Sequence, residues 1–189
     1  CSAMRVNFVG ELGWELHHPI EYQNHIFDQL MEAGKEFGLK PYGIRAMNSL
    51  RVEKSYKLVG TELSIEYSPY ESGLDRFVHP NKGDFIGRAA LDKWRAKGFS
   101  NKLVTMEIHG VTDADVLGNN PIYDNGSVVG RATSGDFGFR LNKSIALGMV
   151  KPELAKVGQK LKIDILGKMH EASIVEESPY DSENKLLRA

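Results

Sequence analysis

The spacing of apolar and polar positions changes along the chain and divides it into two parts near Gly98. In the first part, apolar residues recur at helical spacing. This spacing predicts three helices, over residues 21–37, 44–56 and 88–96. Two short strands, 5–9 and 14–17, are expected around a glycine-bounded turn at the start, and residues 73–78 are expected to be extended. The first helix is amphipathic, so we expect one of its faces to pack on a core.

After Gly98 the apolar and polar residues alternate, as they do in half-buried strands. The alternating runs cover residues 103–108, 128–132, 145–150, 160–165 and 168–175. Asp124-Asn-Gly126 separates two apolar stretches and is typical of a hairpin turn. The pattern therefore predicts an α+β fold with two domains, 1–97 and 98–189, of which the second is a small antiparallel barrel or sandwich.

Composition narrows the range of functions without naming one. The 189 residues carry a net charge of −1, so no strong field favours nucleic acid or a membrane surface. No apolar run is long enough to span a bilayer. Cys1 is the one cysteine, which excludes an internal disulfide framework and fits a reducing compartment. We therefore predict a cytoplasmic protein with neither nucleic-acid nor membrane partners.

The histidines give no support for a metal site. Zinc sites need three or four convergent donors, usually with recognisable local spacing. His17 and His18 are adjacent and would face opposite sides of a strand, and the other four histidines are scattered. No metal is expected, and hydrogen-bonded or surface histidines explain the pattern better.

Glu53 is the carboxylate with two interpretations. It lies late on the predicted helix 44–56, which also carries Arg45 and Arg51. One interpretation is a solvated helix with charges of both signs. The other is a carboxylate that faces a pocket and accepts two hydrogen bonds from a planar, amidine-like ligand edge. The pattern alone does not decide between them.

An ordered series of short motifs resembles the glycine cleavage T-protein (aminomethyltransferase) family. The series consists of Val9–Glu15, Gly43–Glu53, Ser68-Pro69, Lys82–Leu91, Gly130–Gly135 and Ser144–Val150. The tail, from Ser178 onward, looks most like the T-protein-like end of dimethylglycine and sarcosine dehydrogenases. Each motif alone is weak, but the set stands in register over almost the whole chain.

The resemblance implies part of a tetrahydrofolate-binding domain over 1–97, followed by the family's barrel over 98–189. It also implies transfer of a one-carbon unit from an amine or iminium to tetrahydrofolate, giving 5,10-methylenetetrahydrofolate. The implied partners are folate and a small methylated amine, or a lipoyl carrier protein if the parent is a true T protein. A parent of the dehydrogenase type would carry FAD in an upstream domain. Two alternatives stay open: a folate-dependent demethylase of a sulfonium substrate, and a non-catalytic folate-binding module.

The resemblance assigns cofactor-binding roles to four residues. Glu53 matches the family glutamate that hydrogen-bonds the pterin, whose 2-amino and N3–H groups offer two parallel donors. Lys82 stands at a basic position that contacts the folate, Trp14 at an aromatic position, and Tyr56 is a further candidate. Tyr180 would lie near the cofactor if the tail folds back.

The main departure from the family pattern is that this chain has no residue that matches the family's essential aspartate. That residue belongs to a segment upstream of the Val9–Glu15 motif, and neither Asp75 nor Asp84 matches its surroundings. No catalytic residue is therefore assigned. The resemblance implies a truncated C-terminal piece of a longer enzyme, which by itself would be a poor catalyst.

Overall fold

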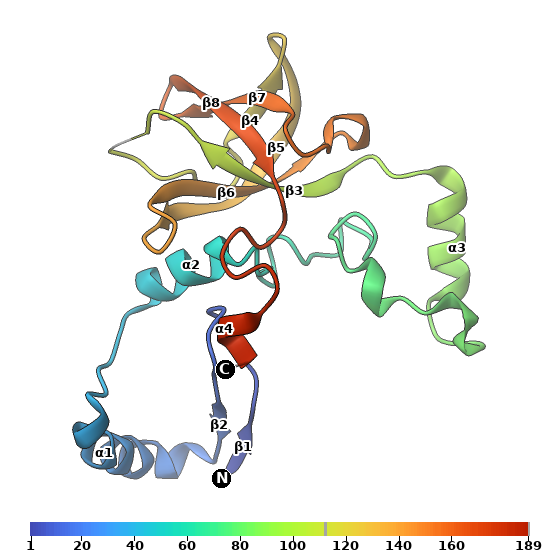
Figure 1. Cartoon of the computed structure of the whole chain (residues 1–189). Coiled ribbons are helices and arrows are strands. Elements are labelled where there is room, and N and C mark those ends of the chain that lie inside the picture. The colour runs from blue at the N-terminus through green and yellow to red at the C-terminus, as the bar shows by residue number, and fades with distance from the viewer. Residues whose placement is uncertain (112, 189) are drawn as a thin grey trace.

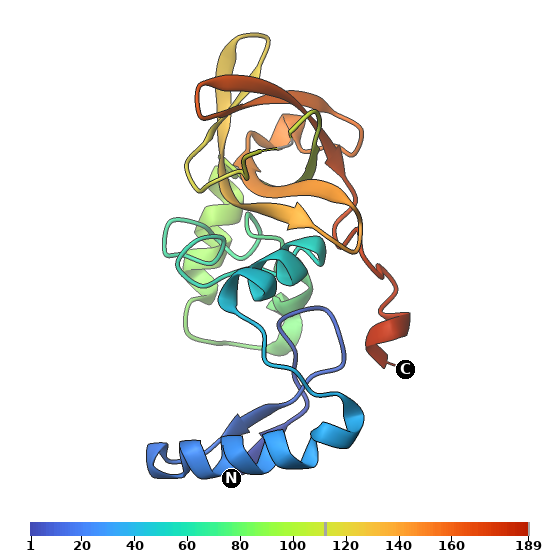
Figure 2. The same ribbon diagram turned by 90° about the vertical axis from the view of Figure 1, so that its left-hand side faces the viewer.

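The computed structural model describes residues 1–111 and 113–188. A β-barrel lies at one end of the molecule, with helix α2 (Ile44–Glu53) directly beneath it (Figure 1). The N-terminal hairpin and helix α1 (Gln23–Ala33) lie at the opposite end, and helix α3 (Arg88–Lys97) stands to one side (Figures 1 and 2). The C-terminal tail leaves the barrel and runs back past α2 toward the hairpin, which brings distant segments of the chain together.

The barrel closes in the strand order β3-β6-β5-β4-β7-β8, and every neighbouring pair is antiparallel. Its strands are β3 (Lys102–Ile108), β4 (Pro121–Asp124), β5 (Ser127–Gly138), β6 (Lys143–Val150), β7 (Lys160–Ile165) and β8 (Lys168–Val175). The main hydrophobic core fills this barrel, and Met106, Ile122 and Ile163 are fully buried in it. The predicted α+β fold with an antiparallel barrel is confirmed.

The predicted hairpin joins β4 to β5. Asn125 and Gly126 both have positive φ, 48° and 81°, as a tight two-residue hairpin turn requires. Strand β5 is longer than the predicted run 128–132, and it includes a bulge between Ala132 and Ser134. This bulge explains why simple alternation stops at residue 132.

The N-terminal region differs from the prediction in its first strand. Strands β1 (Ser2–Met4) and β2 (Glu15–His17) pair in antiparallel fashion, so the strand expected over 5–9 is wrong. The backbone N–H of Gly10 donates to Asn7 Oδ1 (3.0 Å), which replaces strand pairing with a turn. Residues 73–78 are not extended either, because they contain the 3₁₀ turn Asp75–Phe77.

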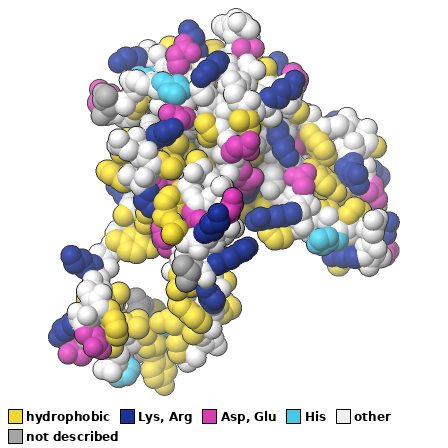
Figure 3. Space-filling model, viewed as in Figure 1, with side chains coloured by type: hydrophobic (Ala, Val, Ile, Leu, Met, Phe, Trp, Pro, Cys, Tyr) yellow, Lys and Arg dark blue, Asp and Glu magenta, His cyan; other side chains and the backbone are white. Residues whose placement is uncertain are grey.

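Helix α1 forms within the predicted segment 21–37 but buries none of its residues. The expected packing of its apolar face on a core is therefore wrong for this chain. Large apolar side chains stay exposed across residues 1–44 and gather at the lower left of the space-filling view (Figure 3). They include Leu12, Trp14, Ile20, Tyr22, Phe27, Leu30, Phe37, Tyr42 and Ile44. Uncovered apolar surface of this extent is typical of a face that another polypeptide segment covers.

Helix α2 is fixed to the barrel by polar contacts with β5. Asn48 Nδ2 donates to Asp136 Oδ2 (2.7 Å), and Ser49 Oγ donates to the carbonyl of Phe137 (2.6 Å). The chain ends in the short helix α4 (Lys185–Arg188). Among the described helices, none has the length and apolar character needed to cross a membrane.

Candidate functional site

A cavity of about 600 Å³ lies where the end of α2, the following loop and the C-terminal tail meet. Its volume falls within the range of small-molecule sites. The lining residues come from four stretches of chain: Phe8; Tyr56, Lys57 and Leu63; Gly73, Leu74, Asp75 and Arg76; and Glu177, Ser178, Ser182 and Asn184. A ligand there would touch both ends of the sequence at once.

The cavity wall combines aromatic rings with charges of both signs. Phe8 and Tyr56 are half-buried and supply the rings. Lys57 Nζ is paired with Glu177 at 2.5 Å. The guanidinium of Arg76 lies 4.8 Å from the ring centroid of Phe77, and no described carboxylate lies within 4 Å of it. Arg76 therefore offers an unneutralised cation to a ligand carboxylate.

The end of α2 places Tyr56 in this wall. Ser55 adopts the left-handed conformation (φ 56°), which ends the helix, and the N–H of Tyr56 donates to the carbonyl of Arg51 (3.0 Å). Ser55 Oγ lies 2.8 Å from Thr105 Oγ1 on β3 and accepts from the N–H of Ser178 (2.9 Å). Barrel and tail thus both fix the turn that carries Tyr56.

Glu53, the predicted pterin ligand, is fully buried. Its Oε1 accepts from the backbone N–H groups of Arg140 (2.7 Å) and Leu141 (3.0 Å), and its Oε2 accepts from Arg140 Nε. Gly138 allows this approach, because a Cβ there would lie 2.7 Å from Glu53 Cγ. The interpretation as a solvated carboxylate is therefore wrong, because the side chain is buried and protein donors occupy both of its oxygens. Its contact with a pterin stays a prediction.

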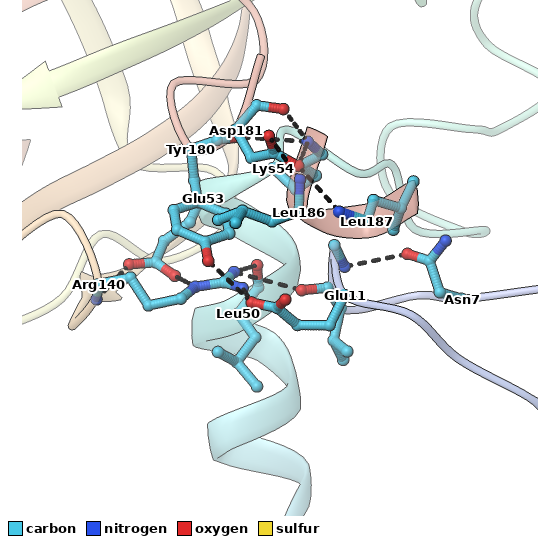
Figure 4. Close-up of polar contacts among 12 residues, drawn as sticks. Asn7, Glu11, Leu50, Glu53, Lys54, Arg140, Tyr180, Asp181, Leu186 and Leu187 are labelled. Carbon is cyan, nitrogen blue, oxygen red and sulfur yellow. Dashed lines mark hydrogen bonds and ion pairs between the residues drawn. The ribbon is translucent and has the colours of Figure 1, made fainter. Parts of the chain in front are cut away.

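Arg140 joins Glu53 to two further segments (Figure 4). Its guanidinium donates to Glu11 and lies 3.8 Å from the ring centroid of Tyr180. The hydroxyl of Tyr180 in turn donates to Glu11 Oε1 (3.0 Å). Burial lowers the pKa of Arg140, but its hydrogen bonds to Glu53 and Glu11 outweigh this effect and raise it above the ordinary value. Arg140 is therefore a permanent cation between two carboxylates.

Lys54 forms a second anchor for the tail. Its side chain is 1% exposed, and Nζ donates to the carbonyls of Tyr180 (3.1 Å) and Asp181 and lies 3.6 Å from Asp181 Oδ2. Burial raises the pKa of Asp181, but hydrogen bonds from the backbone of α4 and the charge of Lys54 outweigh it, so the net pKa lies below the ordinary value. The same carboxylate thus caps α4 and binds Lys54.

The remaining predicted residues lie elsewhere or touch the site indirectly. Trp14 is 60% exposed. Lys82 Nζ lies 4.7 Å from the ring centroid of Phe85. Neither Trp14 nor Lys82 is among the described residues that line the cavity, and their folate contacts stay predictions. The tail folds back, which is the condition set for Tyr180, and the ring of Tyr180 contacts Arg140. Its proximity to a cofactor stays a prediction.

Sequence reasoning missed Phe8, Arg76, Arg140 and Glu11. Arg140 lies in the turn between β5 and β6, and its partner Glu53 is 87 positions away. Nothing in the local pattern of a turn arginine indicates such a partner. Phe8 could have been found, because it directly precedes the Val9–Glu15 motif.

Two protein-family models match the sequence of this chain. The GCVT N-terminal domain matches residues 1–82, and the glycine cleavage T-protein C-terminal barrel domain matches residues 101–181. The chain belongs to the glycine cleavage T-protein family. The match to the barrel domain contains strands β3–β8. The match to the N-terminal domain contains the cavity residues Phe8, Tyr56 and Arg76. The exact domain boundary at 97/98 stays a prediction.

Several named proteins are similar to this family member. Human mitochondrial dimethylglycine dehydrogenase is 41% identical over 93% of the chain and 20% of its own length. The aminomethyltransferase of Desulfitobacterium hafniense strain Y51 is 36% identical over 93% of the chain and 47% of its own length. The crystal structure of the glycine cleavage system aminomethyltransferase T from Bartonella henselae superposes with a TM-score of 0.85 at 24% identity, over 95% of the chain and 50% of that protein. The chain thus spans half or less of these relatives.

Proposed function

We propose that this chain is the folate-holding part of an aminomethyltransferase-type enzyme that transfers a one-carbon unit to tetrahydrofolate, giving 5,10-methylenetetrahydrofolate. The observation that carries the proposal is the cavity at the end of α2, with two aromatic rings and an unneutralised arginine in its wall. Membership of the T-protein family and the aminomethyltransferases among its relatives support the same assignment.

Tetrahydrofolate fits the chemistry of this wall. Its pterin and aminobenzoyl groups are flat rings, and its glutamate end carries carboxylates. Phe8 and Tyr56 can pack on the rings, since aromatic pairs prefer offset or edge-to-face contacts. Arg76 can form a forked, charge-assisted pair with a ligand carboxylate. Lys57 and Glu177 already neutralise each other, so they add polarity without adding net charge.

In the proposed reaction, N5 of the folate attacks an electrophilic methylene carbon of the donor. N10 then closes the five-membered ring while the bond from that carbon to the donor nitrogen breaks, and the donor leaves as an amine. Holding the two reactants in this geometry accounts for much of the rate of such transfers. The proton transfers need an acid–base group, and we assign that role to no described residue.

For the one-carbon donor, we propose the iminium of a small methylated amine, formed beforehand by a two-electron oxidation of the methyl group that FAD in the predicted upstream domain would supply. Its support is the 41% identity to a dimethylglycine dehydrogenase, against 36% to the aminomethyltransferase from Desulfitobacterium hafniense. A donor delivered on a lipoyl carrier protein is the alternative that the aminomethyltransferases favour. FAD elsewhere in the parent protein and the cytoplasmic location both stay predictions.

The roles that we propose for the four predicted cofactor-binding residues differ. We propose that Tyr56 packs against the folate, and that Glu53 acts indirectly because Arg140 and Leu141 occupy its carboxylate. Trp14 and Lys82 remain proposed contacts for parts of a ligand that extend beyond the cavity.

Calorimetric titration of the chain with tetrahydrofolate, kept reduced, tests the proposal. We expect one saturable site, and we expect Tyr56→Ala to weaken binding about tenfold, or about 1.4 kcal/mol, because an aromatic contact is lost. The matched control is Tyr42→Ala, since Tyr42 is 61% exposed and does not line the cavity. Absence of saturable binding, or equal affinities for the two variants, would contradict the proposal.

A further inference from the structure

The guanidinium of Arg140 is the point at which several separate segments of chain are tied together. Nη2 donates to the carbonyls of Leu50 on α2 (2.6 Å) and Val9 in the N-terminal loop (3.2 Å). Nε and Nη1 donate to the carboxylates of Glu53 and Glu11. The side chain is only 17% exposed, so these contacts are poorly screened by solvent. One side chain thus holds the N-terminal loop, α2 and its own β5–β6 turn.

The C-terminal tail is attached to the same group through Tyr180. The guanidinium lies over the ring at 3.8 Å from the centroid, within the range of cation–π contacts. The N–H of Tyr180 donates to the carbonyl of Glu53 (3.1 Å), and its hydroxyl donates to Glu11 (3.0 Å). Figure 4 shows Arg140, Glu53, Glu11 and Tyr180 converging from these different segments. Arg140 and its partners therefore bind the tail to the N-terminal loop and to α2, beside the separate anchor that Lys54 provides.

The segments that meet at Arg140 are also walls of the cavity. Phe8 directly precedes Val9, Tyr56 lies three residues after Glu53, and Ser178 and Ser182 flank Tyr180 along the tail. Arg140 itself is not among the described residues that line the cavity. It can therefore set the spacing of the walls without touching a ligand.

We propose that Arg140 is the positioning residue of this cavity. It holds the N-terminal loop and the tail against α2, so that the walls keep the spacing a flat ligand needs. The link to folate affinity rests on the proposed function, whereas the attachment of the tail does not.

An arginine is required for this role because four of its N–H directions are used, toward four different acceptors. A lysine keeps the charge but has no planar fork, so it cannot reach the same acceptors together. Glu53 is fully buried, and Nε of Arg140 is the donor to its Oε2. Arg140→Lys therefore tests geometry while it leaves the charge in place.

Hydrogen exchange measured by mass spectrometry, with and without tetrahydrofolate, tests the proposal on the full chain. In Arg140→Lys we expect the amides of residues 178–187 and 7–14 to exchange about tenfold faster, since local opening becomes easier. Amides of β3 and β6 should be unchanged, which would show that the barrel is intact. Tetrahydrofolate affinity should fall about tenfold.

Arg131→Lys is the matched control. Arg131 lies on β5, the strand that precedes the turn of Arg140. Like Arg140 it lies over a tyrosine ring, at 5.8 Å from the Tyr67 centroid, and it pairs with a glutamate, Glu66. It does not line the cavity, so its variant should change neither the exchange of the tail nor the affinity. If Arg140→Lys does not fold, Tyr180→Leu serves instead, because it removes the ring contact of the tail and leaves the donors to Glu53 in place.

The possible results distinguish failure of the Arg140 proposal from failure of the proposed folate function. Unchanged exchange of residues 178–187 in Arg140→Lys or its substitute would overturn the attachment of the tail. Faster exchange with unchanged folate affinity would overturn the positioning role. If the wild-type chain binds no tetrahydrofolate and the tail still loosens in the variant, the attachment holds and the proposed function fails.

Discussion

Buried charged side chains hold the region beneath the barrel together. Arg51 Nη1 lies 3.5 Å from Glu62 Oε2, and the two side chains are 3% and 0% exposed. Glu62 also accepts from Ser134 Oγ (2.6 Å), from Thr61 Oγ1 (2.8 Å) and from the N–H of Leu58 (2.8 Å). Burial raises the pKa of Glu62, but these hydrogen bonds outweigh it and hold the pKa below the ordinary value. The carboxylate therefore stays ionised at neutral pH.

Glu62→Ala should destabilise the chain by about 3–5 kcal/mol, because it leaves Arg51 charged, buried and without its partner. The control is Glu66→Ala, four residues away. Glu66 pairs with Arg131 at 2.5 Å, but both side chains are well exposed, so the loss should be at most about 1 kcal/mol. Urea unfolding of the two variants gives the comparison, and similar losses would refute this account of the buried pair.

At the scale of single residues, the sequence predicts which side chains are unusual better than it predicts what they contact. Glu53 stands out on its helix, yet its partner Arg140 is 87 positions away and belongs to the turn between β5 and β6. A long-range pair of this kind leaves no periodic signal. Tyr56 was a candidate from the resemblance, and the structure places it in the cavity wall.

At the scale of elements, alternation predicts five of the barrel strands, and the hairpin signal at Asp124-Asn-Gly126 indicates the sixth, β4. Ile122 on β4 is paired with Ile163 on β7, and both are fully buried. Alternation is reliable on β7, where buried and more exposed positions alternate, because one face of that strand packs on the core and the other faces solvent. The same alternation fails over residues 5–9, because the local hydrogen bond from Gly10 to Asn7 competes with strand pairing.

Ile163→Ala should reduce the free energy of unfolding by about 2–5 kcal/mol, because it leaves a cavity in the barrel core. Ile65→Ala is the matched control, as Ile65 is 99% exposed and its truncation should change stability by less than about 0.5 kcal/mol. Thermal or urea denaturation monitored by circular dichroism distinguishes the two. Equal effects would mean that the barrel core does not govern the unfolding transition.

At the scale of the whole molecule, the features that matter most are those that no local pattern predicts. The cavity is built from four stretches of chain that include both terminal regions. The exposed apolar surface of residues 1–44 likewise appears only when the elements are placed in space, because the amphipathic pattern of α1 does not show what covers it (Figure 3). The fold class and the family could be read from the sequence, whereas the cavity and its Arg140 anchor required the structure.

The central claim is that folate binds between the end of α2 and the C-terminal tail. A crystal structure of the chain with tetrahydrofolate tests it most directly. The account predicts ligand density in the cavity, with a flat ring of the folate packed against Tyr56 and Phe8 and its glutamate end toward Arg76, because these side chains supply the matching aromatic and charged contacts. Folate bound at another surface, with this cavity containing only solvent, would contradict the account.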